Sequence, residues 1–248
     1  MTNPATTQLR IAELWRYPVK SLRGEHLDAA VVTPDGIRGD RIVHVRGPRG
    51  PLTGRTRHQL LTLTSRTGPD GEPLVNGHRW NSPQAAAAIT AAAGPRSKLI
   101  HDTAPERFDV LPLLVATEVE IARLGVDGRR LRPNIVLAGA APGEERDWPG
   151  HALRIGNVLI GIHSLRPRCI VTTIDPDTGA QDLEVLRHIR RDFDGAIALN
   201  CWVINGGTIQ QHHPAQIVPL PREAAAGAKP GGWITGQPYP YAAAPNAA

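Results

Sequence analysis

Short apolar runs separated by glycine- and proline-containing turns constrain this chain more than any other feature of its sequence. Twenty-five glycines and 23 prolines are spread over 248 residues. Short runs bounded by such turns are typical of β-strands, because a strand needs only about four to eight residues. The first hundred residues contain four such runs, at Ile11–Arg16, Ala29–Thr33, Arg41–Arg46 and Gln59–Thr64.

Three later segments have helical features instead. Gln84–Ala93 is alanine-rich and follows Asn81-Ser82-Pro83, which places a capping residue and a first-turn proline at a helix start. Leu111–Leu124 has apolar residues at helical spacing and ends at Gly125, and Leu183–Phe193 is expected to be a basic helix. Further strands are expected at Pro133–Ala138, Ala152–Ser164, Leu199–Ile204 and Gln216–Leu220.

These patterns predict a fold that is mainly β with some α. Apolar residues make up 41% of the chain, which is enough for the core of one large domain or two small ones. From Arg222 onward alanine, glycine and proline dominate without periodicity, so we expect a flexible tail.

The sequence lacks membrane-spanning and secretory segments and has few cysteines, and these features restrict the expected location and cofactors. No apolar run approaches the roughly 20 residues of a membrane-spanning helix, and Met1–Pro4 lacks the features of a secretory signal. We therefore expect a cytoplasmic protein with no membrane partner. Two cysteines, Cys169 and Cys201, are too few for an iron–sulfur cluster, which takes about four thiolates, so a redox centre needs another kind of ligation.

The positive charge of the chain is concentrated in one segment. There are 28 basic and 23 acidic residues overall, but residues 16–66 alone hold ten basic and four acidic ones. With five Trp, three Tyr and two Phe there is no stacking platform for nucleic acid. Interspersed arginines suit a small phosphorylated ligand better, because guanidinium groups bind phosphate oxygens bidentately.

The residues by themselves offer a few candidates for chemistry. Cys169 follows two arginines in Arg166-Pro167-Arg168-Cys169, and their charge favours a thiolate, which is a nucleophile and a soft-metal ligand. A small buried hydrophobe is the alternative reading of Cys169, and it is the expected role of Cys201. Arg132 and Asn134 are two residues apart at a strand start, so both can face one polar ligand, although each is also compatible with a solvated surface.

Several ordered segments between residues 9 and 210 carry the motifs of one family. The sequence resembles the MOSC proteins, which are related to the C-terminal domain of molybdenum cofactor sulfurase. The resemblance is strongest to two-part members similar to the mitochondrial amidoxime-reducing component and its bacterial relatives. The segments are Leu14–Ser21, Gly36–Arg41, Thr56–Gln59, Leu131–Val136, Asp147-Trp148, Leu153–Gly156, and Arg168-Cys169 with Thr172-Thr173 and Asp175–Gly179.

This resemblance implies an N-terminal β-barrel-like subdomain in residues 1–100, a C-terminal MOSC β-barrel in 101–222 and a tail in 223–248. A molybdenum cofactor, the Mo-pyranopterin, would lie between the two parts. By the resemblance, Cys169 corresponds to the molybdenum ligand, and Asp109 to an acid near the metal, so both are candidate catalytic residues. The residues that correspond to those around the pterin and its phosphate are Lys20, Ser21, Arg41, Arg132, Asn134 and Arg168.

The leading hypothesis is a molybdenum-dependent reductase of N-hydroxylated or related N–O and S–O compounds. Because the cysteines of a fused ferredoxin domain are absent from the sequence, electrons are expected from a separate electron-donor protein. One alternative is a carrier that hands on the molybdenum cofactor, or sulfur bound to Cys169, without turning over a substrate. Another is a basic-surface nucleic-acid binder, although we expect no nucleic acid among the partners.

Overall fold

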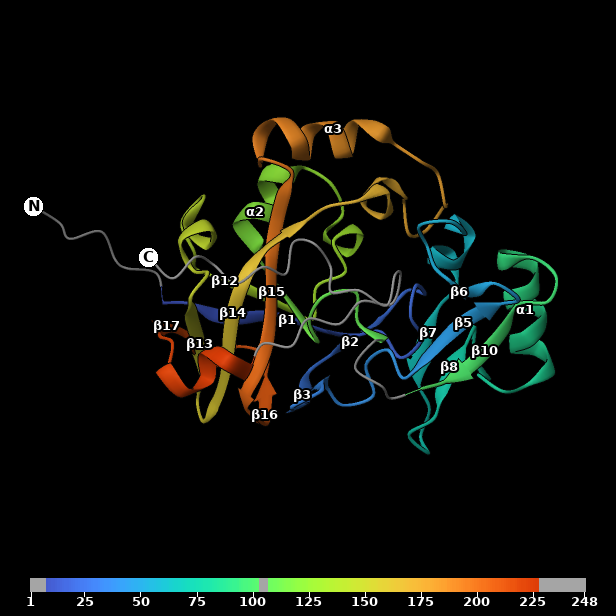
Figure 1. The fold of residues 1–248 in the computed structure, drawn as a ribbon, viewed down its shortest axis with the longest axis horizontal. Helices are drawn as coiled ribbons and strands as arrows, with labels where there is room; N and C mark the ends of the chain where they lie inside the picture. The colour runs from blue at the N-terminus through green and yellow to red at the C-terminus, as the bar shows by residue number, and fades with distance from the viewer. Residues whose placement is uncertain (1–7, 103–106, 228–248) are drawn as a thin grey trace, which may run out of the picture.

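The computed structural model describes residues 8–102 and 107–227, and its largest element is an eight-stranded sheet (Figure 1). Its eight strands form seven hydrogen-bonded neighbouring pairs. Six of these pairs are antiparallel, and the pair of β11 and β12 is parallel. A parallel pair needs a crossover, which here includes helix α2 (Glu118–Leu124). The strands in spatial order are β17 (Gln216–Pro219), β13 (His151–Ile155), β14 (Val158–Pro167), β15 (Ala196–Asn205), β11 (Leu113–Thr117), β12 (Ile135–Ala138), β1 (Arg10–Arg16) and β2 (Glu25–Leu27).

The large sheet combines strands from both halves of the chain. Leu14 of β1 is opposite Ile135 of β12, and both side chains are fully buried in the main core cluster. β14 and β15 are each ten residues long and pair antiparallel, with Ile162 opposite Cys201. The first strand of the chain therefore completes a sheet that is built mainly by residues after 110.

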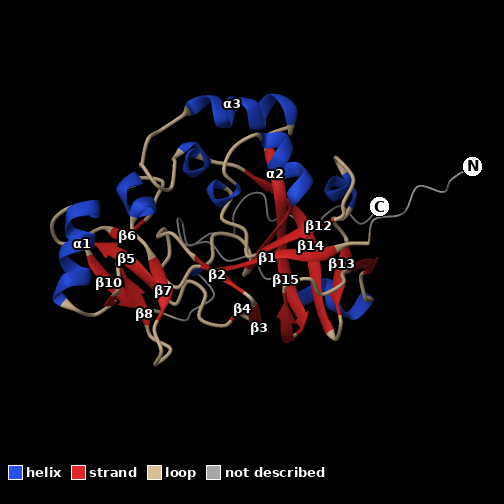
Figure 2. Cartoon of the chain, turned by 180° about the vertical axis from the view of Figure 1, so that it is seen from behind, coloured by secondary structure: helices blue, strands red, loops and turns tan. Residues whose placement is uncertain are grey.

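Three small sheets accompany the large one. In Figures 1 and 2, β5, β10 and α1 lie at one end of the molecule and the long strands β14 and β15 toward the other. A second core cluster, which includes Val43, Leu60 and Ile89, holds the smaller end together. The small sheets are β10 (Lys98–His101), β5 (Val43–Gly47) and β6 (Gly50–Leu52); β16 (Gly207–Gln210), β3 (Ala29–Thr33) and β4 (Gly36–Ile37); and β7 (Ser65–Thr67), β8 (Pro73–Val75) and β9 (His78–Arg79).

Two of the predicted helices are confirmed, the first together with its predicted start signal. Helix α1 (Pro83–Ala93) begins at Ser82, whose hydroxyl accepts a hydrogen bond from the Ala85 N–H at 3.2 Å. Helix α3 (Leu183–Asp192) buries Val185 and Ile189 and exposes its basic side. It lies across the top of the molecule in Figure 1.

The prediction of a strand at Gln59–Thr64 is wrong. Residues His58–Thr62 form the 3₁₀ turn η1, and Leu60 and Leu61 are both buried. Successive residues of a strand point to opposite faces, whereas this turn buries two neighbouring side chains. Leu60 packs in the second core cluster, and Leu61 lies in the wall of a cavity.

The helix predicted over Leu111–Leu124 is half wrong. Leu113–Thr117 is strand β11, and only Glu118–Leu124 is helical. A buried central strand is apolar on both faces, so its pattern cannot be distinguished from a buried helix by periodicity. The Thr117 hydroxyl accepts from the Glu120 N–H at 3.4 Å and marks the point where the strand ends.

The fold class, mainly β with some α, is confirmed by 17 strands and three α-helices within the described residues. Of the expected tail, Arg222–Gly227 forms a 3₁₀ turn, and residues 228–248 lie outside the described residues. The division at residues 100 and 222 stays a prediction.

Candidate functional site

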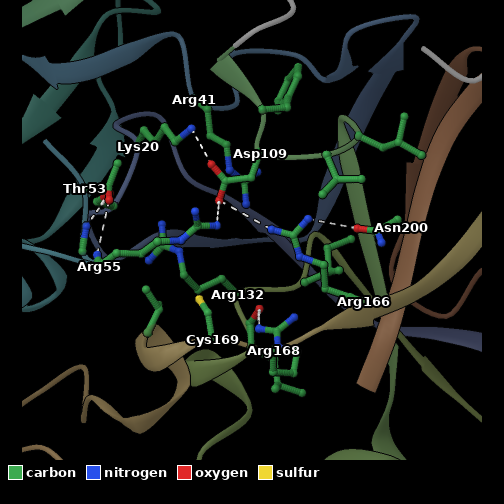
Figure 3. A pocket seen from close by; sticks show the side chains of 18 of the residues that line it. Lys20, Arg41, Thr53, Arg55, Asp109, Arg132, Arg166, Arg168, Cys169 and Asn200 are labelled. Carbon is green, nitrogen blue, oxygen red and sulfur yellow. Dashed lines mark hydrogen bonds and ion pairs between the residues drawn. The ribbon is translucent and has the colours of Figure 1, made fainter. Parts of the chain in front are cut away.

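One cavity, lined by residues 20–61 of the first half of the chain and residues 108–200 of the second, gathers every site residue that the sequence predicted. Figure 3 shows its charged side chains converging from both halves, with the sulfur of Cys169 directed toward the arginines. The eight predicted residues that line it are Lys20, Ser21, Arg41, Asp109, Arg132, Asn134, Arg168 and Cys169.

Three of these residues have left-handed backbone conformations. The φ angles are 75° at Ser21, 53° at Arg41 and 60° at Arg132. Such angles are unfavourable for residues with a Cβ and persist only where the surroundings hold them, which happens often at ligand-binding sites. Here the Arg41 N–H donates to the Tyr17 carbonyl at 2.7 Å, and the Arg132 N–H donates to the Arg129 carbonyl at 3.1 Å.

Asp109 is the centre of the charged network. Its carboxylate accepts from Lys20 Nζ at 2.7 Å, from Arg55 Nη2 at 3.1 Å and from Arg166 Nη2 at 3.5 Å. Burial by itself raises the pKa of Asp109, but the three cations outweigh it and hold that pKa well below its usual range. Asp109 is therefore a carboxylate at neutral pH and positions three basic side chains.

Arg41 and Arg132 share one aromatic ring. Their guanidinium carbons lie 5.0 and 4.4 Å from the ring centroid of Tyr17, a cation–π distance for both. Burial lowers the pKa of Arg132 to about 10, although it stays charged at neutral pH. No described residue accepts a hydrogen bond from the buried Nη2 atom of Arg132. A buried donor without a partner is costly, so this atom favours an anion in the cavity.

Arg168 and Cys169 form the opposite wall. Arg168 Nη2 donates to the Leu131 carbonyl at 2.7 Å, while its buried Nε atom has no hydrogen-bond partner among the described residues. Burial and the neighbouring Arg166 lower the pKa of Arg168 to about 10. The Cys169 thiol is half-buried, and its residue caps the 3₁₀ turn η5 (Ile170–Thr173).

The second thiol has a different environment. Cys201 is fully buried in the main core cluster, and burial raises the pKa of its thiol far above the usual range. It lies outside the cavity lining, so the structure confirms that Cys201 is a buried core residue.

Asn134 and Ser21 use their side chains to hold the walls. The Asn134 amide oxygen accepts from the Leu114 N–H at 3.1 Å, and its Nδ2 donates to the Trp15 carbonyl at 3.3 Å. The Ser21 hydroxyl accepts from the Gly54 N–H at 3.0 Å. Both therefore fix backbone segments around the cavity, a role that their spacing in the sequence did not reveal.

Two basic residues of the cavity were not singled out as site residues by sequence reasoning. Arg55 was counted only within the basic segment, and Arg166 was considered only as a neighbour of Cys169. Arg166 also donates to Asn200 Oδ1 at 3.2 Å, which ties it to strand β15. Its spacing of two from Arg168 at the end of an extended segment was an available signal.

The cavity has a strong excess of positive charge. Among the described residues its lining has one acidic side chain, Asp109, and six basic ones. Such a lining favours an anion that carries several charges, as a phosphorylated ligand does. The basic residues are Lys20, Arg41, Arg55, Arg132, Arg166 and Arg168.

The described residues contain no group of three or more His, Cys, Asp or Glu side chains that could hold a metal ion. A metal at Cys169 would therefore need most of its ligands from a cofactor. In the same described ranges, no helix has the length and apolar character needed to cross a membrane.

Fold and site together define a two-part, mainly β protein with a cavity lined by arginines from both halves of the chain and a half-buried cysteine in its wall. The MOSC domain family matches residues 114–215, and the MOSC N-terminal beta barrel domain family matches residues 8–105. The chain belongs to the MOSC family, and it carries both domains. The resemblance that the motifs indicated is thereby confirmed.

The relatives of this chain include amidoxime-reducing components. Mitochondrial amidoxime reducing component 2 of Bos taurus is 28% identical over 244 residues, covering 73% of this chain and 72% of that protein. Mitochondrial amidoxime-reducing component 1 of Homo sapiens is 26% identical over 245 residues, with 73% and 72% covered. Molybdenum cofactor sulfurase of Bombyx mori is 30% identical over 82 residues, which cover 33% of this chain and 10% of that protein.

Solved structures with some likeness to this chain were also found. The YuaD protein from Bacillus subtilis is 11% identical, covers 86% of this chain and 97% of its own, and has a TM-score of 0.46. YiiM from Escherichia coli is 13% identical, covers 86% of this chain and 70% of its own, and has a TM-score of 0.41.

Proposed function

We propose that this protein is a reductase that depends on a molybdenum cofactor and acts on N-hydroxylated or related N–O and S–O compounds. The observation that carries the proposal is the Cys169 thiol in the wall of a cavity with six basic side chains. The amidoxime-reducing components among its relatives support the type of reaction.

The residues present fit a pyranopterin cofactor. The partnerless donors on Arg132 and Arg168 and the excess of positive charge suit its phosphate and dithiolene groups. Cys169 offers a thiolate, the kind of ligand that soft metal centres prefer. When bound, the cofactor supplies the two-electron redox chemistry, while the protein binds and orients it.

The chain's own residues have distinct parts in this proposal. Lys20, Arg132 and Arg168 bind the anionic end of the cofactor, and Cys169 holds the metal. The Asp109 carboxylate keeps Arg55 and Arg166 in place. Its depressed pKa makes it a poor proton donor near neutral pH, so we assign it a positioning role.

The overall reaction fixes what else the protein needs. Reduction of an N-hydroxyamidine to an amidine breaks the N–O bond, takes up two electrons and two protons, and releases the oxygen as water. The electrons come from a separate electron-donor protein. Cytoplasmic location is part of the same proposal.

The first test removes the thiol. We expect purified protein from a host that makes the cofactor to hold about one molybdenum, and Cys169→Ser to lose the metal or the turnover, because a hydroxyl is a harder and poorer donor. Elemental analysis, pterin fluorescence and consumption of an N-hydroxyamidine with reduced viologen are measured together. Cys201→Ala is the matched control and should keep its metal. Full molybdenum and full activity in Cys169→Ser would exclude it as the ligand.

The second test concerns the anionic end of the cofactor. Lys20→Ala and Arg132→Ala should each lower pterin affinity about tenfold or more, because a hydrogen bond to a charged group contributes roughly 1.5–3 kcal/mol. Arg187→Ala, on the exposed side of α3, should have little effect. Equal losses at all three positions would indicate diffuse electrostatics and argue against this site.

A cofactor or sulfur carrier is the second candidate function, and the sulfurase relative favours it. A carrier releases its pterin, whereas a reductase retains it over many turnovers. Loaded protein is incubated with an apo-molybdoenzyme, and pterin transfer is followed beside reduction of N-oxides, hydroxylamines and sulfoxides. Transfer without any reduction would replace the reductase proposal with the carrier.

A further inference from the structure

A second cavity adjoins the candidate cofactor cavity, and nothing in the proposed function uses it. Arg132 lines both cavities. Like the first, the second cavity is formed by both halves of the chain. Its lining consists of Trp15, Tyr17, Arg23, Gly24, Thr64, Arg129, Arg132 and Pro176.

Three arginines give this cavity the character of an anion site. The Nε atom of Arg23 is buried and lacks a hydrogen-bond partner among the described residues, and Arg132 is shared with the first cavity. Arg129, the third, is held by Asp127 and Asp177, whose hydrogen bonds raise its pKa further above its usual range. Buried guanidinium donors without acceptors favour an oxyanion such as phosphate.

Asp177 occupies the position between two of these arginines. Its carboxylate accepts from Arg23 Nη1 at 2.6 Å and from Arg129 Nη2 at 2.5 Å, so it links the two halves of the chain. The Asp177 side chain is 52% exposed and lies in the turn formed by residues 176–178. Solvent-exposed ion pairs contribute little stability, so a phosphate with more charge can displace this carboxylate.

An indole ring forms another part of the wall. The Trp15 Nε1 donates to Glu13 Oε2 at 2.6 Å, and the edge of His26 packs against the ring at 5.2 Å between centroids. The indole N–H is therefore already used, and the ring offers apolar surface to the cavity. Aromatic rings beside basic side chains are a common setting for a nucleobase and its phosphate.

We propose that the second cavity binds a nucleoside phosphate. The phosphate lies between Arg23 and Arg129 in place of Asp177, and the base packs against Trp15. Because Arg132 lines both cavities, the nucleotide has two possible sources. It is either joined to the phosphate of the pterin cofactor, a source that rests on the proposed function, or it is a free nucleotide that binds beside the cofactor.

The experiment has one arm for each source. Cofactor extracted from the loaded full-length protein is analysed by mass spectrometry for GMP or CMP attached to the pterin. Separately, GMP, CMP and AMP are titrated into the purified protein by calorimetry. We expect a nucleotide in the first arm or saturable binding in the second. Absence of both would overturn the proposal.

Three variants connect the binding to this cavity. Arg129→Ala and Trp15→Leu should lower the nucleotide content, or weaken titrated binding, about tenfold. Asp177→Asn should strengthen titrated binding, because it removes the competing carboxylate. Arg191→Ala and Asp194→Asn, two exposed positions elsewhere, are the matched controls.

The outcomes separate this inference from the proposed function. Effects of the same size in the control variants would show non-specific electrostatics and overturn the site. If the purified protein holds neither molybdenum nor pterin, the reductase proposal is contradicted, but the nucleotide titration still tests the second cavity. If the protein holds pterin but has no attached nucleotide and binds none in the titration, only the inference of a nucleotide site is contradicted.

Discussion

At the residue scale, the candidate site depends on one carboxylate that holds several cations together. Asp109 contacts Lys20, Arg55 and Arg166, which come from three separate segments of the chain. Without this charge, three basic side chains would face one another in a partly buried space. The carboxylate therefore stabilises the walls of the cavity and arranges its donors for an anionic ligand.

Asp109→Asn should reduce stability in a pH-dependent way. A carboxyl whose pKa is depressed in the folded state contributes stability above its unfolded pKa, near 3.8, and loses it as the pH falls through the folded pKa. The melting temperature of Asp109→Asn should therefore lie below that of the natural protein at pH 7, and the gap should narrow below about pH 4. Asp194→Asn, at an exposed site, should show no such gap. A gap independent of pH would contradict the ion-pair account.

At the element scale, the long antiparallel pair of β14 and β15 contributes to the wall of the cavity. Gly161 of β14 is opposite Trp202 of β15. The indole packs over this glycine and joins a cluster with Val110 and Leu111, which follow Asp109 directly and line the cavity. The absence of a side chain at residue 161 thus lets the ring support the segment that carries Asp109.

Gly161→Ala should lower the free energy of unfolding by about 1–3 kcal/mol, the usual range for overpacking. A Cβ atom at this position would lie 2.3 Å from the Trp202 ring, so the ring or the strand must move. Chemical denaturation of Gly161→Ala, Trp202→Leu and the double variant forms a cycle. The double variant should be less destabilised than the sum of the two single changes, and strict additivity would argue against the clash.

At the scale of the whole molecule, the two family domains share a sheet. β1 and β2 precede residue 30, yet they pair at the end of the large sheet beside β12. The candidate cofactor cavity and the second cavity are also lined from both halves. Cofactor binding is therefore expected to be coupled to the docking of the halves.

A fragment of residues 101–248 should not fold cooperatively by itself. It lacks β1, so the edge of β12 and the buried surface around Ile135 would be exposed to water. Adding residues 8–37 through a linker should restore part of the far-ultraviolet circular dichroism and a melting transition. A cooperative transition in the fragment without β1 would show that the second domain is independent.

The local sequence determined those features that depend on neighbouring residues. Ser82 and Pro83 predicted the start of α1, and the motifs around Lys20, Arg132 and Cys169 predicted residues that line one cavity. Tertiary structure decided the remainder. Leu113–Thr117 is a strand because it lies between β15 and β12, and Arg55 and Arg166 belong to the site because Asp109 draws them together. These outcomes depend on pairing and charge between residues at least 20 positions apart, which local propensity and spacing do not encode.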